Sequence, residues 1–242
     1  DDRRALERKR PSPTNLEMDL DGQLALQAGD YATAEQVYSE FIARRANAWE
    51  PRFWRAKAYE ALGHTAKALT DYEVAAALAP ADPVPRHNLG RLMTLTGDLM
   101  EGESRLRKAL ELDPANARAA EYLAHNLIQQ GKAAAAQGDG PAAEKYFAEA
   151  ESVTRRSLRA EPDLPWSHLN LGTIFVERAR LSQPPDRDLL SRSLEEARKA
   201  ASLSESGDED PGGEVLRKAL ANQCDVLIEL REAPGEASGG AG

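Results

Sequence analysis

The residues best spaced for nucleotide chemistry lie at 138–143. This run, GDGPAA, fits the pattern G-x-G-x-x-A, in which glycines bring a backbone close to a pyrophosphate. That chemistry needs a preceding β-strand and a βαβ crossover. The segment before Gly138 is instead rich in alanine, which is typical of a helix. We therefore predict a turn between two helices here and no nucleotide site.

Acidic residues are spaced for a cation at two places. The run 17–22 is similar to the opening of a calcium loop, but its twelfth position, which needs a bidentate glutamate, is Ala28. Asp208, Glu209 and Asp210 form an acidic cluster that is more typical of a hydrated loop. We predict neither a metal site nor a cofactor site.

Catalytic residue types are scattered along the chain. The histidines His64, His87, His125 and His168 show no HExxH spacing, and no Gly-x-Ser-x-Gly turn occurs. The only cysteine, Cys224, has no activating histidine near it in sequence, so we interpret it as a small buried hydrophobic residue. We expect no catalytic residues, although a site assembled from distant residues stays open at this point.

Composition narrows the possible partners. A net charge of −9 argues against general nucleic-acid binding, which needs a concentrated basic surface. A short basic run at the N-terminus is the exception, and we interpret it as a solvated tail: Arg3, Arg4, Arg8, Lys9 and Arg10. No apolar run approaches the ~20 residues that cross a bilayer, so we expect no membrane insertion. Because the sequence starts at Asp1, we expect a processed form or a fragment. A cytoplasmic and an exported (periplasmic) location both stay open.

A period of 34 residues runs through the first half of the chain. It is kept by glycines, by small residues, by large residues and by prolines: Gly29, Gly63, Gly97 and Gly131; Ala34, Ala68 and Gly102; Tyr38, Tyr72 and Leu106; Pro80 and Pro114. Glycine suits the left-handed residue that ends a helix, and proline cannot continue one. Each period therefore predicts a helix, a turn, a second helix and a stop.

Residues 83–116 resemble a full tetratricopeptide repeat. The motifs that match are Leu89-Gly90, Gly97-Asp98, Ala109-Leu110 and Leu112-Asp113-Pro114. Arg86 and Met93 replace an aromatic residue and a tyrosine of the family pattern. The resemblance implies an all-α protein, a right-handed α-solenoid of helix-turn-helix repeats with a C-terminal capping helix.

The repeats divide the chain into expected segments. These are a basic N-terminus (1–14), a solenoid (15–206), an acidic loop with a capping helix (207–232) and a tail (233–242). The solenoid units are 15–48, 49–82, 83–116, 117–163 and 164–206. The fourth is longer by about two helical turns per helix if its turn moves from Gly131 to Gly138. In the capping helix the expected apolar face is Leu216, Leu220, Leu227 and Leu230.

In the tetratricopeptide family the first helices of successive repeats line a concave groove that binds peptides. By position, the resemblance implies these groove residues: Phe53, Trp54, Lys57, His87, Asn88, Arg91, Arg118, Tyr122, His125, Trp166 and Asn170. Only Asn88 and Arg118 agree with the family's clamp for chaperone tails, so we do not expect that ligand.

Two properties of this groove stay open, namely the charge of its ligand and which of its residues contact that ligand. Lys57, Arg91 and Arg118 outnumber Glu60 and Glu121 along it, which favours an acidic peptide. The alternative for Trp54, Trp166 and Asn88 is that they only pack or bond within the fold.

The sequence thus predicts a non-catalytic scaffold or adaptor that binds a protein or peptide partner. One alternative is a repeat module of a larger protein, which could be exported, positioning an enzymatic or electron-transfer domain that this sequence lacks. A self-associating assembly scaffold is the other.

Overall fold

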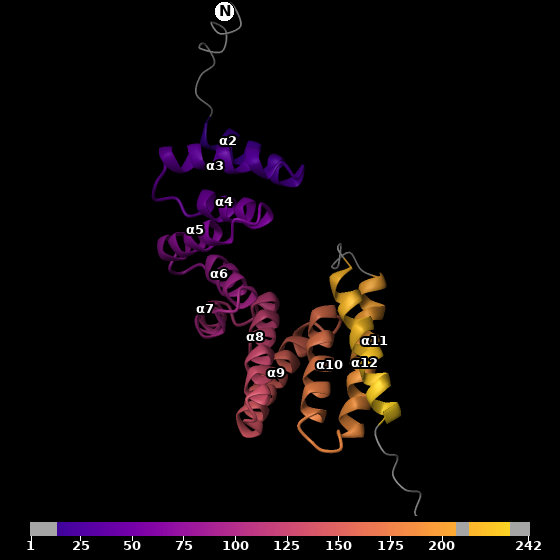
Figure 1. Cartoon of the computed structure of the whole chain (residues 1–242). Coiled ribbons are helices and arrows are strands. Elements are labelled where there is room, and N and C mark those ends of the chain that lie inside the picture. The colour runs from indigo at the N-terminus through magenta and orange to yellow at the C-terminus, as the bar shows by residue number, and fades with distance from the viewer. Residues whose placement is uncertain (1–13, 207–212, 233–242) are drawn as a thin grey trace, which may run out of the picture. The chain divides into compact units, whose positions relative to one another are not determined.

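The computed structural model describes residues 14–206 and 213–232, and within these ranges the chain forms helices and no strand. It divides into two compact units, residues 1–92 and 93–242, and the boundary falls inside α6 (Pro83–Leu95). Unit 1 also contains α2 (Asn15–Gln27), α3 (Tyr31–Arg44), α4 (Glu50–Ala61) and α5 (Thr65–Leu78). Unit 2 contains α7 (Leu99–Leu112), α8 (Ala117–Ala136), α9 (Gly140–Ala160), α10 (Pro165–Ala179), α11 (Arg187–Ser206) and α12 (Glu214–Glu232) (Figure 1).

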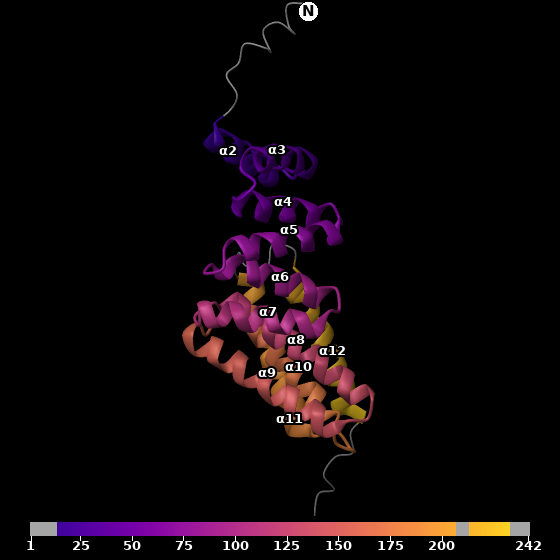
Figure 2. The same cartoon turned by 90° about the vertical axis from the view of Figure 1, so that its left-hand side faces the viewer.

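In both units, most helices pack against a neighbour in sequence. Contacts join α2 to α3, α3 to α4 and α4 to α5 in unit 1, and α7 to α8, α8 to α9 and α10 to α11 in unit 2. Figure 2 shows the same pairing from the side, with α2 beside α3 and α4 beside α5. The predicted all-α solenoid of paired helices is confirmed.

The turn of the longest helix pair is closed at Gly138. Its φ of 80° lies in the left-handed region that glycine adopts without steric cost. The N–H of Asp139 then donates to the carbonyl of Ala134 at 3.0 Å, and the Asp139 carboxylate accepts from the N–H of Ala142, also at 3.0 Å. This turn lies where the sequence spacing predicts it, and the helices on either side, α8 and α9, are 20 and 21 residues long.

Gly131 keeps the 34-residue step but lies inside α8, where it has a packing role. A Cβ atom added there would approach the ring of Phe147 to 2.5 Å. Glycine therefore lets α9 lie close against α8, with Phe147 fully buried between them.

Unit 1 combines an apolar core with a buried ion pair. Tyr38 and Phe41 of α3 pack with Met18 of α2. In the neighbouring pair, the Arg55 guanidinium donates to both carboxylate oxygens of Asp71, at 2.7 and 2.8 Å, and Asp71 is only 3% exposed. Hydrogen bonding to Asp71 raises the pKa of Arg55, so this pair holds α4 and α5 together as charged partners.

In unit 2, α12 packs on α10 and α11 through a face that differs from the predicted one. Its buried residues are Val215, Ala219 and Val226. Among the predicted leucines, Leu216 and Leu230 pack against these clusters, but Leu220 and Leu227 are exposed.

The prediction that Cys224 is buried was wrong, since this residue is exposed. Small side chains dominate the buried face because they let α12 approach α10 and α11 closely, and this turns the larger leucines outward.

Several predicted segments lie outside the described residues. These are the basic N-terminal run, the cluster Asp208–Asp210 and the tail after residue 232. Among the helices that are described, none is both long enough and apolar enough to cross a bilayer.

Candidate functional site

A pocket of about 190 Å³ lies in unit 2 between α8, α10 and α12. Each helix contributes a side chain with a polar end: His125 from α8, Trp166 from α10 and Lys218 from α12. The other lining residues are Ile128, Gln129, Leu169, Asn170 and Thr173. Three of the predicted groove residues, His125, Trp166 and Asn170, therefore meet at one place.

Helical spacing brings these residues to the pocket. His125, Ile128 and Gln129 are three and four residues apart on α8, so they share one face. Trp166, Leu169 and Asn170 share a face of α10 in the same way. The pocket therefore lies between the adjacent faces of α8 and α10, with α12 at its edge.

The electrostatics of the pocket keep His125 neutral. Burial lowers the pKa of His125 to about 4, and the nearby cations Lys218 and Lys132 lower it further. Lys218 Nζ lies 4.8 Å from the centre of the Trp166 ring, within range of a cation–π interaction. Its ammonium also donates to Glu214 at 2.7 Å. The pocket therefore offers a neutral imidazole, an aromatic face and one lysine.

The remaining predicted residues of unit 2 have mixed positions. Asn170 is buried, and its amide donates to the carbonyl of Glu121 at 3.1 Å, which ties α10 to α8. Tyr122 is half-buried against the apolar core. Arg118 is exposed at the start of α8.

In unit 1, α4 carries three predicted groove residues with different exposures. Phe53 is buried and stacks edge-on against Trp54, with ring centres 4.9 Å apart. Trp54 is half-buried beside the apolar core of α2 and α3. Lys57 is exposed, and its ammonium lies 5.5 and 5.7 Å from the centres of these two rings.

The predicted residues of α6 are engaged within unit 1. The side-chain amide of Asn88 donates to the carbonyl of Val84 at 2.9 Å, one helical turn earlier. Arg91 forms an ion pair with Glu60 of α4, which also accepts a hydrogen bond from Tyr72 at 2.5 Å. His87 is buried.

Comparison with solved structures shows which known fold this arrangement matches. MamA from Desulfovibrio magneticus RS-1 is 17% identical, with a TM-score of 0.61, over 81% of this chain and 97% of that chain. A tetratricopeptide repeat protein from Parabacteroides merdae is 17% identical, with a TM-score of 0.55, over 90% and 89%. YrrB, described as a TPR protein with an unusual peptide-binding site, is 14% identical, with a TM-score of 0.51, over 80% and 96%.

The chain has the fold of the tetratricopeptide-repeat (TPR) proteins. The resemblance to tetratricopeptide repeats in the sequence is thereby confirmed at the level of fold. No protein-family model matches the sequence, and no curated protein matches it in sequence.

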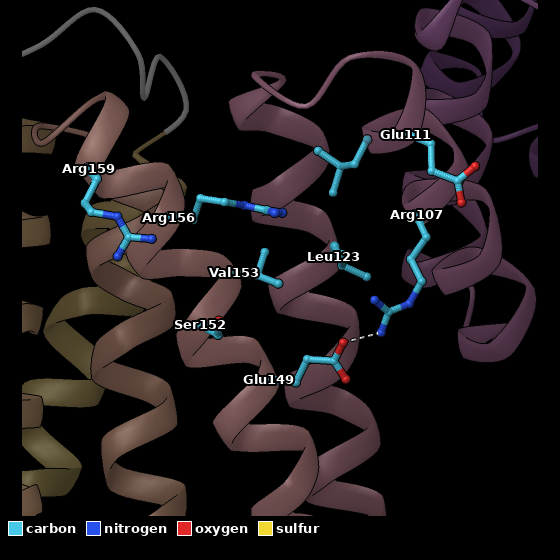
Figure 3. Close-up of a pocket in the computed structure, with 9 residues that line it drawn as sticks. Arg107, Glu111, Leu123, Glu149, Ser152, Val153, Arg156 and Arg159 are labelled. Carbon is cyan, nitrogen blue, oxygen red and sulfur yellow. Dashed lines mark hydrogen bonds and ion pairs between the residues drawn. The ribbon is translucent and has the colours of Figure 1, made fainter.

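A second cleft, of about 440 Å³, lies between the second helices of two TPR pairs, α7 and α9, with Leu123 of α8 between them. Figure 3 shows Arg107 of α7 pointing toward Glu149 of α9, where they form an ion pair at 2.6 Å. Arg156 and Arg159 of α9 also line this cleft and form no ion pair with the residues that the structure describes. These two arginines were not among the predicted site residues.

The structure gives no metal site in its described ranges, where no group of three or more histidine, cysteine or acidic side chains is arranged to hold an ion. His168 is instead a structural residue of its TPR pair. Its Nδ1 lies 2.6 Å from the Glu196 carboxylate, and its Nε2 lies 2.8 Å from the carbonyl of Pro162. This buried ring connects α10 to α11 and to the preceding loop.

Sequence reasoning missed some pocket residues for two different reasons. Ile128, Gln129 and Leu169 could have been found, because they lie three or four residues from His125 or Trp166 on the same TPR helix face. Lys218 gave no such signal, since only the packing of α12 on α10 brings it to the pocket.

Proposed function

We propose that this chain is a non-catalytic interaction scaffold that binds a segment of a partner protein along the first helices of its TPR pairs. The observation that carries this proposal is the pocket at which His125, Trp166 and Lys218 meet, because it lies between first helices. A concave, mostly apolar site with a few polar groups is the usual form of a ligand site.

The pocket has the groups that an extended or helical peptide requires. The half-buried Trp166 ring offers a flat apolar face, and buried Ile128 and Leu169 support it from below. Gln129 is half-buried, and its side-chain amide makes no hydrogen bond to the residues that the structure describes. An amide can donate to and accept from a peptide backbone at once, so Gln129 can bind the backbone of the segment while the Trp166 ring packs against one of its side chains.

An acidic partner segment fits the charges of the groove better than a basic one. The Lys218–Glu214 ion pair is about half exposed on both sides, and such pairs contribute little. A carboxylate of the partner can therefore replace Glu214 beside Lys218. Arg118, at the start of α8, makes no ion pair within the described ranges and adds a second positive group. Arg91 contributes less, since Glu60 already neutralises it.

The α4 surface of unit 1 is proposed as a second contact for the same kind of ligand. Lys57 is exposed above Phe53 and Trp54, so a partner can meet its ammonium and the edge of the Trp54 ring together. Buried Phe53 and His87 then support this surface from below without touching the ligand. YrrB has the same fold and is described as having a peptide-binding site, which supports this kind of ligand.

Peptide selection tests the proposal and needs no assumption about the sequence of the partner. Phage-displayed peptides are selected on the whole chain, and the best binders are synthesised and titrated by fluorescence anisotropy. We expect Lys218→Glu and Gln129→Ala to weaken acidic binders by about tenfold each, which corresponds to about 1.4 kcal/mol. Lys199→Glu, on exposed α11 surface, is the matched charge control and should leave binding unchanged.

Two results would contradict the proposal that peptides bind at this pocket. If the selected peptides bind Lys218→Glu and Gln129→Ala as tightly as the parent chain, the pocket is not where they bind. If Lys199→Glu weakens binding as much as Lys218→Glu does, the effect is one of overall charge. Far-UV circular dichroism of each variant checks that its helices are retained.

A further inference from the structure

Two arginines in the cleft between α7 and α9 have no partner among the residues that the structure describes. Arg156 and Arg159 line this cleft of about 440 Å³, and both are exposed. Neither forms an ion pair or a hydrogen bond within the described ranges. Figure 3 shows the Arg156 side chain extending from α9 into the cleft, toward the side where Leu123 lies. Both guanidinium groups are therefore available to a ligand.

The other charged groups of the cleft already neutralise one another. Arg107 forms ion pairs with Glu149 at 2.6 Å and with Glu103 of its own helix at 2.8 Å. Glu111 forms an ion pair with Lys108 at 2.7 Å. The charge that remains at the cleft is that of the two unpaired arginines. In a chain with a net charge of −9, this local excess of positive charge favours an anionic ligand.

The stability of α9 explains only one of these arginines. Arg159 lies in the last turn of the helix, where a cation interacts favourably with the negative end of the helix dipole. Arg156 lies before that turn. The residues one turn away from Arg156 on its own helix are Ser152, Val153, Arg159 and Ala160, and none of them is a carboxylate. The helix therefore gives Arg156 no partner, and a ligand can supply one.

The floor of the cleft is apolar. Leu110, Leu123 and Val153 come from three different helices and are 9%, 2% and 8% exposed. Because they are nearly covered, they add little contact area for a ligand. Their effect is electrostatic, since a charge beside a region that excludes water is screened less than a charge on open surface. A carboxylate is therefore bound more strongly beside Arg156 than beside an ordinary surface arginine.

The shape of the cleft favours a protein segment over a small molecule or a nucleic acid. Exposed Arg156, Arg159, Ser152 and Glu111 line it, so the cleft is open to solvent. Sites for small molecules bury most of their ligand, which an open cleft does not. A nucleic acid would bring many phosphates close to the carboxylates of Glu111 and Glu149. An acidic protein segment brings few charges and covers the open side.

We propose that this cleft is a separate docking site, at which Arg156 and Arg159 hold carboxylates of an acidic segment from a partner protein. The two arginines are three residues apart on α9, so they are offset by about 4.5 Å along the helix axis. Acidic residues three or four apart on a helical segment are offset by about 4.5 to 6 Å. Each carboxylate can accept two hydrogen bonds from one guanidinium. The expected ligand thus has acidic residues one helical turn apart.

This docking site is distinct from the pocket between α8, α10 and α12. Leu123 lines the cleft and His125 lines the pocket. Residues two apart on a helix point to nearly opposite sides, so the cleft and the pocket lie on different sides of α8. A partner can occupy either site alone. The inference therefore does not depend on the function proposed above.

Peptide selection on a chain that carries Lys218→Glu tests the docking site, because this substitution removes the cation of the pocket. We expect phage-displayed peptides with acidic residues three or four apart to be enriched. Adding Arg156→Glu should weaken the synthesised binders by about tenfold in fluorescence anisotropy, which corresponds to about 1.4 kcal/mol. Arg198→Glu on α11 is the matched control, since Arg198 is exposed and lines neither site, and it should leave binding unchanged.

Photo-cross-linking then locates the bound peptide. A benzophenone group is placed beside the acidic residues of the best binder, and the cross-linked positions are identified by mass spectrometry. Cross-links to α7 or α9 are the expected result. Cross-links confined to α10, α11 and α12 would place the peptide elsewhere and overturn the proposal.

Four other outcomes would also overturn it. Acidic peptides that bind the Arg156→Glu chain as tightly as before do not use the cleft. Equal weakening by Arg198→Glu would mean that only overall charge matters. Displacement of the peptide by a single-stranded DNA oligonucleotide at lower concentration than by the peptide itself would identify a polyphosphate ligand. Self-association in sedimentation velocity that Arg156→Glu abolishes would identify a second copy of the chain as the occupant. Far-UV circular dichroism checks that each variant keeps its helices.

Discussion

Acidification should destabilise this protein through the side chain of His125. Burial holds the pKa of His125 near 4, compared with an ordinary value of 6.5. Below pH 6.5 the unfolded chain binds a proton at this histidine, whereas the folded chain does not. The free energy of unfolding therefore falls as the pH is lowered from 6.5 to 4. Below pH 4 both states are protonated, and the loss stays constant.

The size of this loss follows from the difference between the two pKa values. For each pH step of one between them, the free energy of unfolding changes by about 1.4 kcal/mol, so values near 6.5 and 4 give up to about 2 kcal/mol at pH 5. His125 keeps some contact with solvent, which weakens the effect of burial. We therefore expect a loss of about 1 to 2 kcal/mol at pH 5 relative to pH 7.

Two measurements check this expectation. An NMR titration of the imidazole Cε1–H signal, assigned by its disappearance in His125→Gln, should show a midpoint near pH 4. Urea unfolding of the parent chain and of His125→Gln at pH 7 and pH 5 should show that the parent loses more stability on acidification. Lys218→Met should raise the midpoint only partly, because burial is the larger cause of the lowered pKa and the Lys218 charge the smaller one.

The reasoning would be refuted by a titration midpoint at pH 6.5 or above. That result would mean that the ring is solvated or paired with an anion, so the pocket would not be the neutral site described above. Equal losses of stability in the parent chain and in His125→Gln would lead to the same conclusion.

Three further predictions concern packing. Gly131→Ala should destabilise unit 2 by about 1 to 2 kcal/mol in thermal unfolding, because the new methyl group meets a buried ring, whereas Gly140→Ala, with nothing within 4 Å, should not. Arg55→Met should lower the free energy of unfolding by about 2 to 3 kcal/mol in urea titrations, since it removes both charged hydrogen bonds to the buried Asp71 carboxylate and leaves only Arg52, 3.9 Å away. Cys224 should react with a thiol reagent in the native state at low protein concentration. A reaction that needs denaturant would contradict its exposure.

The repeat could be predicted from sequence because its signals are local. A glycine after one helix and a proline after the next act on the backbone of their own neighbours, so Gly63 and Pro80 indicate a turn and a stop whatever the distant contacts are. The position of the long turn at Gly138 followed from the same kind of signal. The role of Gly131 could not be predicted in this way, because it depends on the ring of Phe147 in the next helix.

The candidate site could be predicted only in part. Position within a repeat placed His125, Trp166 and Asn170 on first helices, and the structure brings these three residues to one pocket. It could not show that Phe53 is buried, that Asn88 bonds to its own helix or that Arg91 is neutralised by Glu60. A helix position specifies a direction, but whether a side chain in that direction is available depends on what the neighbouring helices place against it.

By itself, the sequence determined that this chain forms paired helices of the TPR type, where most of them turn, and that no local catalytic motif is present. Tertiary structure decided which helix faces are covered. It turned Leu220 and Cys224 of α12 toward solvent and carried Lys218 to the pocket. The physical reason is that backbone turns depend on residues a few positions apart, whereas burial depends on the close fit of side chains from helices far apart in the chain.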